Sequence, residues 1–130
     1  MESRRDMEKL TGKVALVTGG GTGIGKETSL LLAREGVNIA INYSRSKTEA
    51  EQTASDIEKL GQKGIAICAD VSNDKSVRKM MDEVVANLGR LDILVNNAGT
   101  TQFIPIDDLE GMTEKIWDEI LAVNLKGTFF

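Results

Sequence analysis

The stretch Thr18-Gly19-Gly20-Gly21-Thr22-Gly23-Ile24-Gly25 decides the fold that this sequence predicts. It stands between an apolar run, Val14–Thr18, and a helical pattern over Lys26–Glu35. Glycines here allow a sharp turn from strand to helix and let the backbone approach a pyrophosphate, to which the helix start offers free N–H groups. A turn without a ligand is the alternative, whereas a Walker-type loop is excluded because no Gly-Lys-Ser/Thr follows. The loop residues expected to contact a dinucleotide are Gly19, Gly21, Thr22, Gly23, Ile24 and Gly25.

Outward from this loop, short apolar runs alternate with amphipathic helical patterns. Alternation of apolar and polar residues from Val37 to Asn42 predicts a second strand that is exposed on one face. Further strands are expected at Gly64–Ala69 and Leu91–Val95, and further helices at Lys47–Leu60, at Val77–Leu88 and after Thr113.

This order of elements, βαβαβαβα, requires a parallel sheet covered by helices on both faces. The expected fold is therefore a Rossmann-type doubly wound α/β sheet with strand order 3-2-1-4. It is incomplete, because the chain holds one half of such a sheet plus a helix. Residues 1–10 are expected to be a polar N-terminal extension and residues 11–130 the dinucleotide-binding half-domain.

The composition excludes several classes of function. A net charge of −4 and an aromatic content of 4% argue against a nucleic-acid surface. The absence of His excludes Ser-His-Asp and Cys-His catalysis and imidazole zinc sites, so no metal is expected. One Cys fits a reducing, cytoplasmic compartment, and no apolar run is long enough to cross a membrane.

The segment after the second strand favours NADP(H) over NAD(H). A carboxylate about twenty residues after the glycine loop would bind the ribose 2′-hydroxyl of NAD. No Asp or Glu stands between Gly36 and Thr48, and the segment instead carries Tyr43, Ser44 and Arg45. A cation and hydroxyls would hold a 2′-phosphate, which a carboxylate would repel. An ordinary solvated basic turn is the alternative.

Together these residues carry a resemblance to the short-chain dehydrogenase/reductase family, from about Leu10 to Phe130. Matching motifs stand in order at compatible spacing; the branch most similar in texture is that of 3-oxoacyl-acyl-carrier-protein reductases and glucose-dehydrogenase-like enzymes. The motifs are Thr18–Gly25 (TGxxxGxG), Asp70-Val71, Asn96-Asn97-Ala98-Gly99 and Asn124-Leu125-Lys126-Gly127.

The resemblance assigns a role to each motif. Asp70 accepts a hydrogen bond from the adenine amino group, and the Val71 N–H meets a ring nitrogen; a helix-capping Asp70 is the alternative. The amides of Asn96 and Asn97 satisfy backbone groups between strands, and the small residues Ala98 and Gly99 leave room for the ribose. Asn124 belongs to the catalytic tetrad, bending its helix and holding a water; a surface Asn is the alternative.

The resemblance also implies what these residues do not contain. The family's Ser and its Tyr-x-x-x-Lys pair lie beyond the Asn, so the chain is expected to be truncated before them and inactive alone. Tyr43 is the only Tyr, and Tyr43–Lys47 is rejected as the catalytic pair because it follows a strand. Cys68 and Trp117 are expected to be packing residues.

The implied parent enzyme is an oxidoreductase that transfers hydride between a nicotinamide and a carbonyl or alcohol, which an acyl carrier protein could present. It is expected to be a homo-oligomer in its full-length form, since the family uses the last helix for subunit contacts. The alternative function is that of a non-catalytic dinucleotide-binding or interaction fragment.

Overall fold

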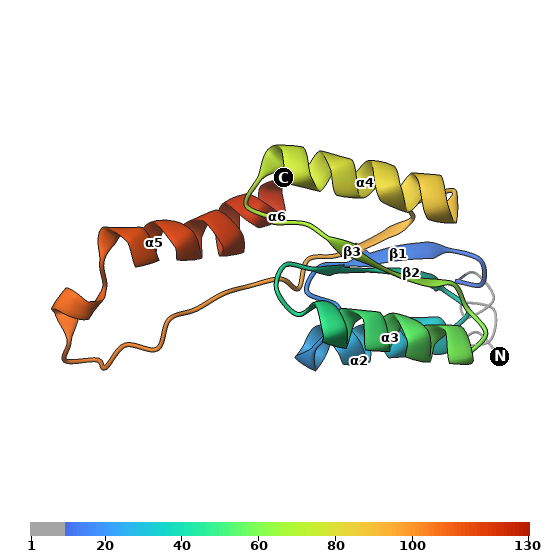
Figure 1. Cartoon of the computed structure of the whole chain (residues 1–130), viewed down its shortest axis with the longest axis horizontal. Helices are drawn as coiled ribbons and strands as arrows, with labels where there is room; N and C mark the ends of the chain where they lie inside the picture. Colours follow the sequence, from blue (N-terminus) through green and yellow to red (C-terminus); the bar gives the residue numbers. More distant parts are fainter. Residues whose placement is uncertain (1–9) are drawn as a thin grey trace.

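The computed structural model describes residues 10–130, and helices alternate with strands along most of that length (Figure 1). The elements are β1 (Val14–Val17), α2 (Gly23–Arg34), β2 (Asn38–Tyr43), α3 (Lys47–Lys59), β3 (Gly64–Cys68), α4 (Asp74–Leu88), β4 (Ile93–Val95), the 3₁₀ turn η1 (Leu109–Gly111), α5 (Glu114–Leu121), the π-helical turn η2 (Ala122–Lys126) and α6 (Gly127–Phe129).

The strands form one parallel sheet in the order β3-β2-β1-β4. Val14 pairs with Asn38 at the start of the β1–β2 register, Ala15 pairs with Ile93 in β4, and β2 pairs with β3 along its length. The predicted Rossmann-type order 3-2-1-4 is confirmed. Because all strands run the same way, their carboxyl ends meet at one edge of the sheet, where α/β proteins bind ligands.

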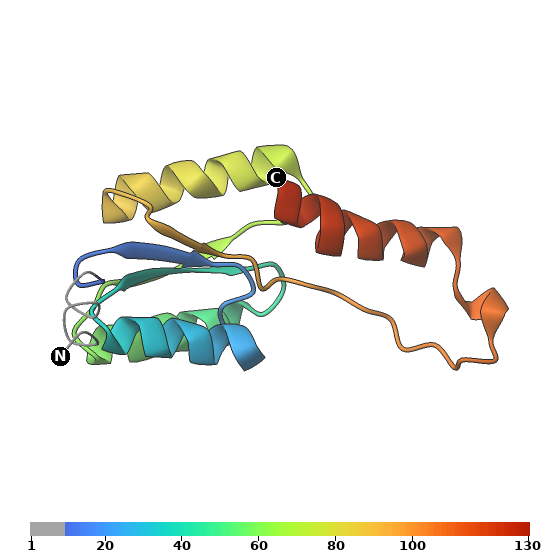
Figure 2. The same cartoon turned by 180° about the vertical axis from the view of Figure 1, so that it is seen from behind.

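Helices cover both faces of the sheet. α2 and α3 lie together on one face and α4 lies on the other (Figures 1 and 2). Along β1, Ala15 and Val17 pack toward α2 and α3, whereas Val14 and Leu16 belong to the cluster beneath α4. Alternate residues of one strand thus enter separate cores, as a strand buried on both faces requires.

The prediction that β2 exposes one face is wrong. Ala40 packs in the α4 cluster and Asn42 is buried, so both faces of the strand are covered. The polar Asn42 is tolerated because its side-chain amide donates to the carbonyl of Ala69 at 3.0 Å and its side-chain oxygen accepts from the amide of Gly19 at 3.2 Å. A buried amide with its partners met costs little.

Side-chain caps and glycine fix the ends of α4, and Thr113 caps α5. Asn73 and Thr113 accept from the amides of Ser76 and Ile116 at the two helix starts, and Gly89 ends α4 in the left-handed conformation at φ 85°. At α2 the side chain of Thr22, which precedes the first helical residue, makes no such cap. The first turn of α2 therefore keeps unsatisfied N–H groups.

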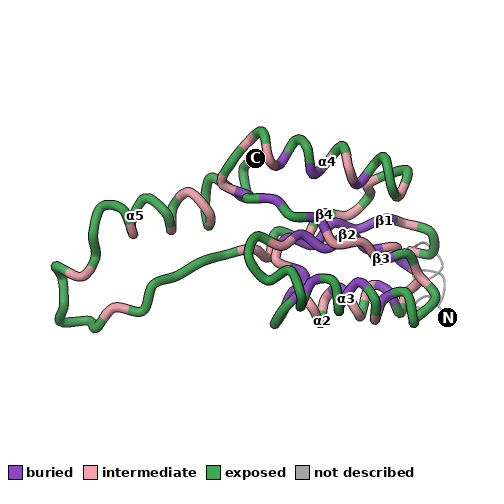
Figure 3. The backbone as a smooth tube through the Cα atoms, in the orientation of Figure 1, coloured by how far each residue is buried: buried purple, intermediate pink, exposed green. Residues whose placement is uncertain are grey.

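Residues 100–121, the arm, leave the sheet after β4. They run outward as a loop and return through η1 and α5, which stands apart from the sheet (Figure 2). No residue of the arm is buried (Figure 3). Trp117 is exposed, and so is Cys68 at the end of β3, so neither is the packing residue that was predicted.

Of the predicted N-terminal extension, residues 1–9 lie outside the described residues, and Leu10 packs against the cluster beneath α2 and α3. Within residues 10–130, no helix combines the length and apolar character of a bilayer span.

Candidate functional site

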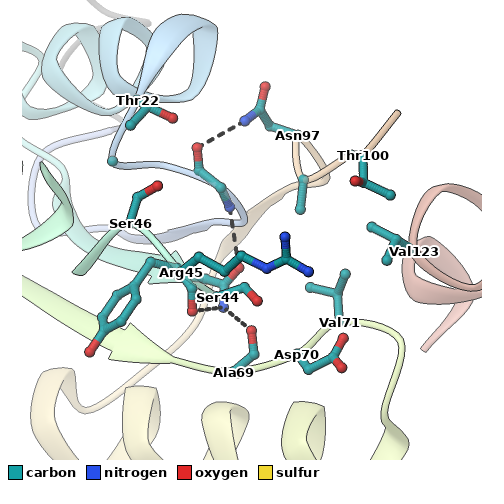
Figure 4. Close-up of a pocket in the computed structure, with 16 residues that line it drawn as sticks. Thr22, Ser44, Arg45, Ser46, Ala69, Asp70, Val71, Asn97, Thr100 and Val123 are labelled. Atoms are coloured by element: carbon teal, nitrogen blue, oxygen red, sulfur yellow. Dashed lines mark hydrogen bonds between the residues drawn. The ribbon is translucent and has the colours of Figure 1, made fainter. Parts of the chain in front are cut away.

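A cleft of about 320 Å³ opens at the carboxyl ends of the strands (Figure 4). Its size lies within the usual range for small-molecule sites. Every strand end contributes to it, either directly or through the loop that follows. It is lined by Gly19, Gly21, Thr22, Asn42, Tyr43, Ser44, Arg45, Ser46, Ala69, Asp70, Val71, Asn97, Ala98, Gly99, Thr100 and Val123.

The glycine loop turns sharply from β1 into α2. Gly19 adopts φ 61°, which favours glycine, and the amides of Gly19 and Gly20 are bound by the side chain and carbonyl of Asn42. Among the described residues, the amides of residues 21–25 donate to no protein acceptor. A row of free N–H groups therefore ends at the start of α2, where the helix dipole adds partial positive charge.

Several loop glycines are required by packing. A Cβ on Gly21 would stand 2.7 Å from the Cα of Ala50, and one on Gly25 would overlap the carbonyl of Gly19. These contacts bring the loop down onto α3 and its own helix. The turn is a packed structure rather than a flexible connection, which weakens the alternative that it is a plain turn.

The segment after β2 forms one wall of the cleft. Figure 4 shows the side chain of Arg45 extending into the cleft on the side of Val71 and Asp70, with Ser44 and Ser46 nearby. Within the described residues Arg45 makes no ion pair with an acidic side chain. Its guanidinium is thus available to an anionic ligand.

Asp70 and Val71 follow β3 and form the part of the cleft next to the segment after β2. One carboxylate oxygen of Asp70 accepts from the amide and hydroxyl of Ser72, at 2.9 and 2.6 Å. The cap of α4 is Asn73 instead, so the alternative that Asp70 merely caps that helix is wrong. The amide of Val71 has no protein acceptor among the described residues. The pair therefore offers the cleft an acceptor and a donor side by side.

Of the two adjacent asparagines after β4, Asn97 lines the cleft and Asn96 does not. Its side-chain amide donates to the carbonyls of Thr18 and Gly19, both at 3.1 Å, and the Thr18 hydroxyl accepts from the backbone amides of Asn97 and Ala98 at 3.0 Å. These bonds tie the end of β4 to the end of β1. Asn96 is exposed and lines no part of the cleft.

Asn124 lies in η2 and holds the start of the arm. Its side chain accepts from the amide of Thr100 at 2.8 Å and donates to the carbonyl of Thr100 at 2.9 Å. Nearby, Gly127 packs so closely on Val71 that a Cβ would stand 2.9 Å from the valine methyl group. Asn124 itself does not line the cleft, whereas Val123 and Thr100 do.

The structure thus brings most of the predicted contact residues together. Those that line the cleft are Gly19, Gly21, Thr22, Tyr43, Ser44, Arg45, Asp70, Val71, Ala98 and Gly99. Those that do not are Gly23, Ile24, Gly25, Asn96 and Asn124. Sequence reasoning named Asn97 within its motif, and Asn42 and Ser46 within the segment after the second strand, without singling them out as contact residues, and it missed Ala69, Thr100 and Val123.

Comparison with known proteins agrees with this fold. A family model described as short chain dehydrogenase matches residues 13–130. The short-chain dehydrogenase/reductase homolog YusS of Bacillus subtilis is 54% identical over 104 residues, covering 80% of this chain and 95% of that protein. The 3-oxoacyl-[acyl-carrier-protein] reductase FabG of Staphylococcus epidermidis is 45% identical over 118 residues, covering 90% of this chain and 47% of its own length.

Solved structures give the same result. A short chain dehydrogenase from Burkholderia cenocepacia in complex with NADP superposes with a TM-score of 0.85 at 42% identity, covering 92% of this chain and 48% of that one. An NAD+-bound xylitol dehydrogenase superposes with a TM-score of 0.83 at 34% identity, covering 93% and 45%. Structures similar to this chain therefore include both an NADP complex and an NAD+ complex.

Proposed function

Because the chain belongs to the short-chain dehydrogenase family, we propose that it binds NADP(H) in the cleft and forms the cofactor-binding part of an oxidoreductase. The reaction of the whole enzyme is hydride transfer between a nicotinamide and a carbonyl or alcohol, and the bound cofactor supplies the hydride. The chain spans about half the length of the FabG and Burkholderia relatives. The observation that carries the proposal is that two residues with free loop amides, Gly21 and Thr22, line the same cleft as Arg45, whose guanidinium forms no ion pair within the described residues.

The loop and the start of α2 fit a diphosphate. The free amides of residues 21–25 are good donors to anionic oxygens, and Thr22 leaves the helix start without a side-chain cap. Their packed surroundings hold the donors in place before a ligand arrives, which reduces the entropy lost on binding. We assign the diphosphate to this loop.

The wall formed by Asp70 and Val71 fits an adenine. Ser72 occupies one oxygen of the Asp70 carboxylate, which leaves acceptor capacity for an exocyclic amino group, and the free amide of Val71 suits a ring nitrogen. This donor–acceptor pair is the complement of an adenine edge. Ala98 and Gly99 on the neighbouring wall are small enough to leave room for a ribose.

The choice of NADP(H) over NAD(H) rests on the wall after β2. Arg45 would bind a 2′-phosphate through charge-assisted hydrogen bonds, with the hydroxyls of Ser44 and Ser46 beside it. Asp70 is the only acidic residue among those that line the cleft, and it follows the neighbouring strand β3 rather than β2. The segment after β2 itself therefore has no carboxylate to repel the phosphate.

Asn124 acts in this proposal as a positioning residue. By holding the backbone of Thr100 on both its amide and its carbonyl, it fixes where the arm leaves the cleft. It lies in a π-helical turn, a form that recurs at functional sites. We propose that this turn sets the wall against which a nicotinamide and substrate would lie.

Among the described residues, no Tyr and Lys stand on one helix face as the family's proton-donating pair would. Tyr43, the single Tyr, ends β2, and Lys47 begins α3, so the two do not share a helical face. We therefore propose that the 130-residue chain binds the cofactor without reducing carbonyls. NADPH oxidation with a 3-oxoacyl thioester by the chain, verified by intact mass, would contradict this.

Cofactor choice is tested by calorimetric titration with NADPH and NADH. The chain is expected to bind NADPH more tightly, and Arg45→Asp should weaken NADPH binding about tenfold to a hundredfold while leaving NADH nearly unchanged. Lys63→Asp makes the same change of charge just before β3, at the opposite edge of the sheet. That control should leave both affinities unchanged, and equal affinity of the unaltered chain for both cofactors would refute the preference.

The alternative, an interaction module, is favoured by the apolar surface of the arm. Phe103, Ile106, Leu109 and Trp117 are all exposed there. Several large apolar side chains exposed on one segment favour a contact with another protein. A homo-oligomer formed through the arm would account for it and is compatible with cofactor binding.

A further inference from the structure

Three successive carbonyls of the glycine loop are each held by a side chain from a different part of the fold. Two of these donors, Ser29 and Thr53, are buried and approach from the interior of the protein, whereas Asn97 lines the cleft. The pairs are Asn97 Nδ2 with the Gly19 oxygen at 3.1 Å, Ser29 Oγ with the Gly20 oxygen at 3.3 Å and Thr53 Oγ1 with the Gly21 oxygen at 3.1 Å.

Ser29 and Thr53 stand out because both hydroxyls are buried, at 0% and 1% exposure, and both have a second acceptor. Each also lies 2.8 to 2.9 Å from the carbonyl four residues earlier in its own helix, that of Gly25 or Glu49. A hydroxyl has one proton to donate. The helical carbonyls already accept an N–H in the helix pattern. Among the described residues, no other group donates to the carbonyl of Gly20 or of Gly21.

Because of the geometry of the peptide bond, these contacts also fix the direction in which the following N–H groups point. In a trans peptide the C=O and the following N–H point in opposite directions, and no peptide among the described residues is cis. When Ser29 draws the Gly20 oxygen inward, the Gly21 N–H turns outward. When Thr53 draws the Gly21 oxygen inward, the Thr22 N–H does the same.

We infer that Ser29 and Thr53 are positioning residues for the dinucleotide, because they keep two carbonyl oxygens away from its diphosphate and aim two amides at it. Gly21 and Thr22, whose amides they aim, both line the cleft. Thr53 is the less obvious of the two, since it lies 32 residues from the loop in sequence and on a different helix, α3. The inference rests on the proposed dinucleotide site.

The test removes the hydroxyl and compares ligands with and without a diphosphate. Thr53→Val keeps the size of the side chain and loses its donor. It should weaken NADPH binding about fivefold to tenfold. Binding of adenosine 2′-monophosphate, which has no diphosphate, should stay within about twofold. Thr53→Ser restores a hydroxyl and should recover most of the NADPH affinity, and Thr48→Val, exposed on the same helix, should change neither ligand.

Each outcome decides the inference. NADPH affinity unchanged in Thr53→Val, or an equal loss for both ligands, overturns it. If Thr53→Val does not unfold cooperatively, Ser29→Ala decides in its place, with the same selective loss expected and an unchanged or unselective result contradicting it. An unaltered chain that binds neither ligand refutes the proposed function, and the inference falls with it.

Discussion

At the scale of single residues, Gly25 shows that the glycine loop leaves no space for a side chain. A Cβ there would stand 2.5 Å from the side-chain nitrogen of Asn97 and would overlap the carbonyl of Gly19, which is backbone and cannot swing aside. In an open helical position, Gly→Ala would stabilise by about 1 kcal/mol. We expect Gly25→Ala instead to destabilise the chain by about 1–3 kcal/mol through overpacking and to abolish NADPH binding.

Urea unfolding and calorimetric titration would measure the two effects of Gly25→Ala. Glu27→Ala, exposed two residues further along the same helix, is the matched control and should alter neither stability nor affinity by much. If Gly25→Ala were as stable as the unaltered chain and still bound NADPH, the close packing of the loop on α2 would be refuted.

The residues that sequence reasoning found and missed differ in a physical way. Arg45 and Asp70 could be predicted because charge and position after a strand indicate chemistry by themselves. The choice between Asn96 and Asn97 could not, since it depends on β4 ending at Val95 and on Asn97 folding back to Thr18. Asn42 was predicted to be solvent-exposed because the sequence does not reveal its hydrogen-bond partners in the interior, the Gly19 amide and the Ala69 carbonyl.

At the scale of elements, Asp92 links the edge strand β4 to β1. Its carboxylate accepts from the Val14 amide at 2.9 Å and from the guanidinium of Arg90 at 2.7 Å. The hydrogen bond from Arg90 is the main cause of a pKa lowered from the ordinary value of Asp92, and the Val14 amide lowers it further.

A lowered pKa in the folded state means that this carboxylate stabilises the fold only while it is ionised. The stabilisation is therefore complete above the unfolded pKa of about 3.9 and is lost as the pH falls through the folded value. Asp92→Asn should unfold at lower urea than the unaltered chain at pH 7, and the difference should shrink below about pH 4. Asp82→Asn, exposed on α4, should show no such difference, and a gap for Asp92→Asn that persisted at low pH would contradict the assignment.

The regular elements followed from the sequence, whereas the π-helical turn did not. β1, α3 and α4 lie where apolar periodicity and glycine stops predict them, to within a few residues. η2 interrupts a helix whose residues have ordinary helical character. Its position depends on long-range contacts, the bonds of Asn124 to Thr100 and the fit of Gly127 on Val71, which no local pattern encodes.

At the scale of the whole molecule, the arm carries a helix, α5, that stands apart from the packed sheet. The amphipathic pattern of α5 predicts burial, yet no residue of α5 is buried, and Trp117 remains 58% exposed. The physical reason is that amphipathic periodicity indicates that a face will be covered without indicating by what. A second copy of the chain is the occupant that the proposed homo-oligomer supplies.

That proposal predicts self-association through the arm. The chain should form a dimer or larger species in sedimentation equilibrium, and Trp117→Glu should shift it toward monomer, because a buried carboxylate without a partner is costly. Leu31→Glu is the matched control, since Leu31 is 57% exposed, almost the same as Trp117, but belongs to α2 and not to the arm. Association that Leu31→Glu disrupts as strongly, or an unaltered chain that is monomeric at every concentration, would show that the arm is not the contact surface.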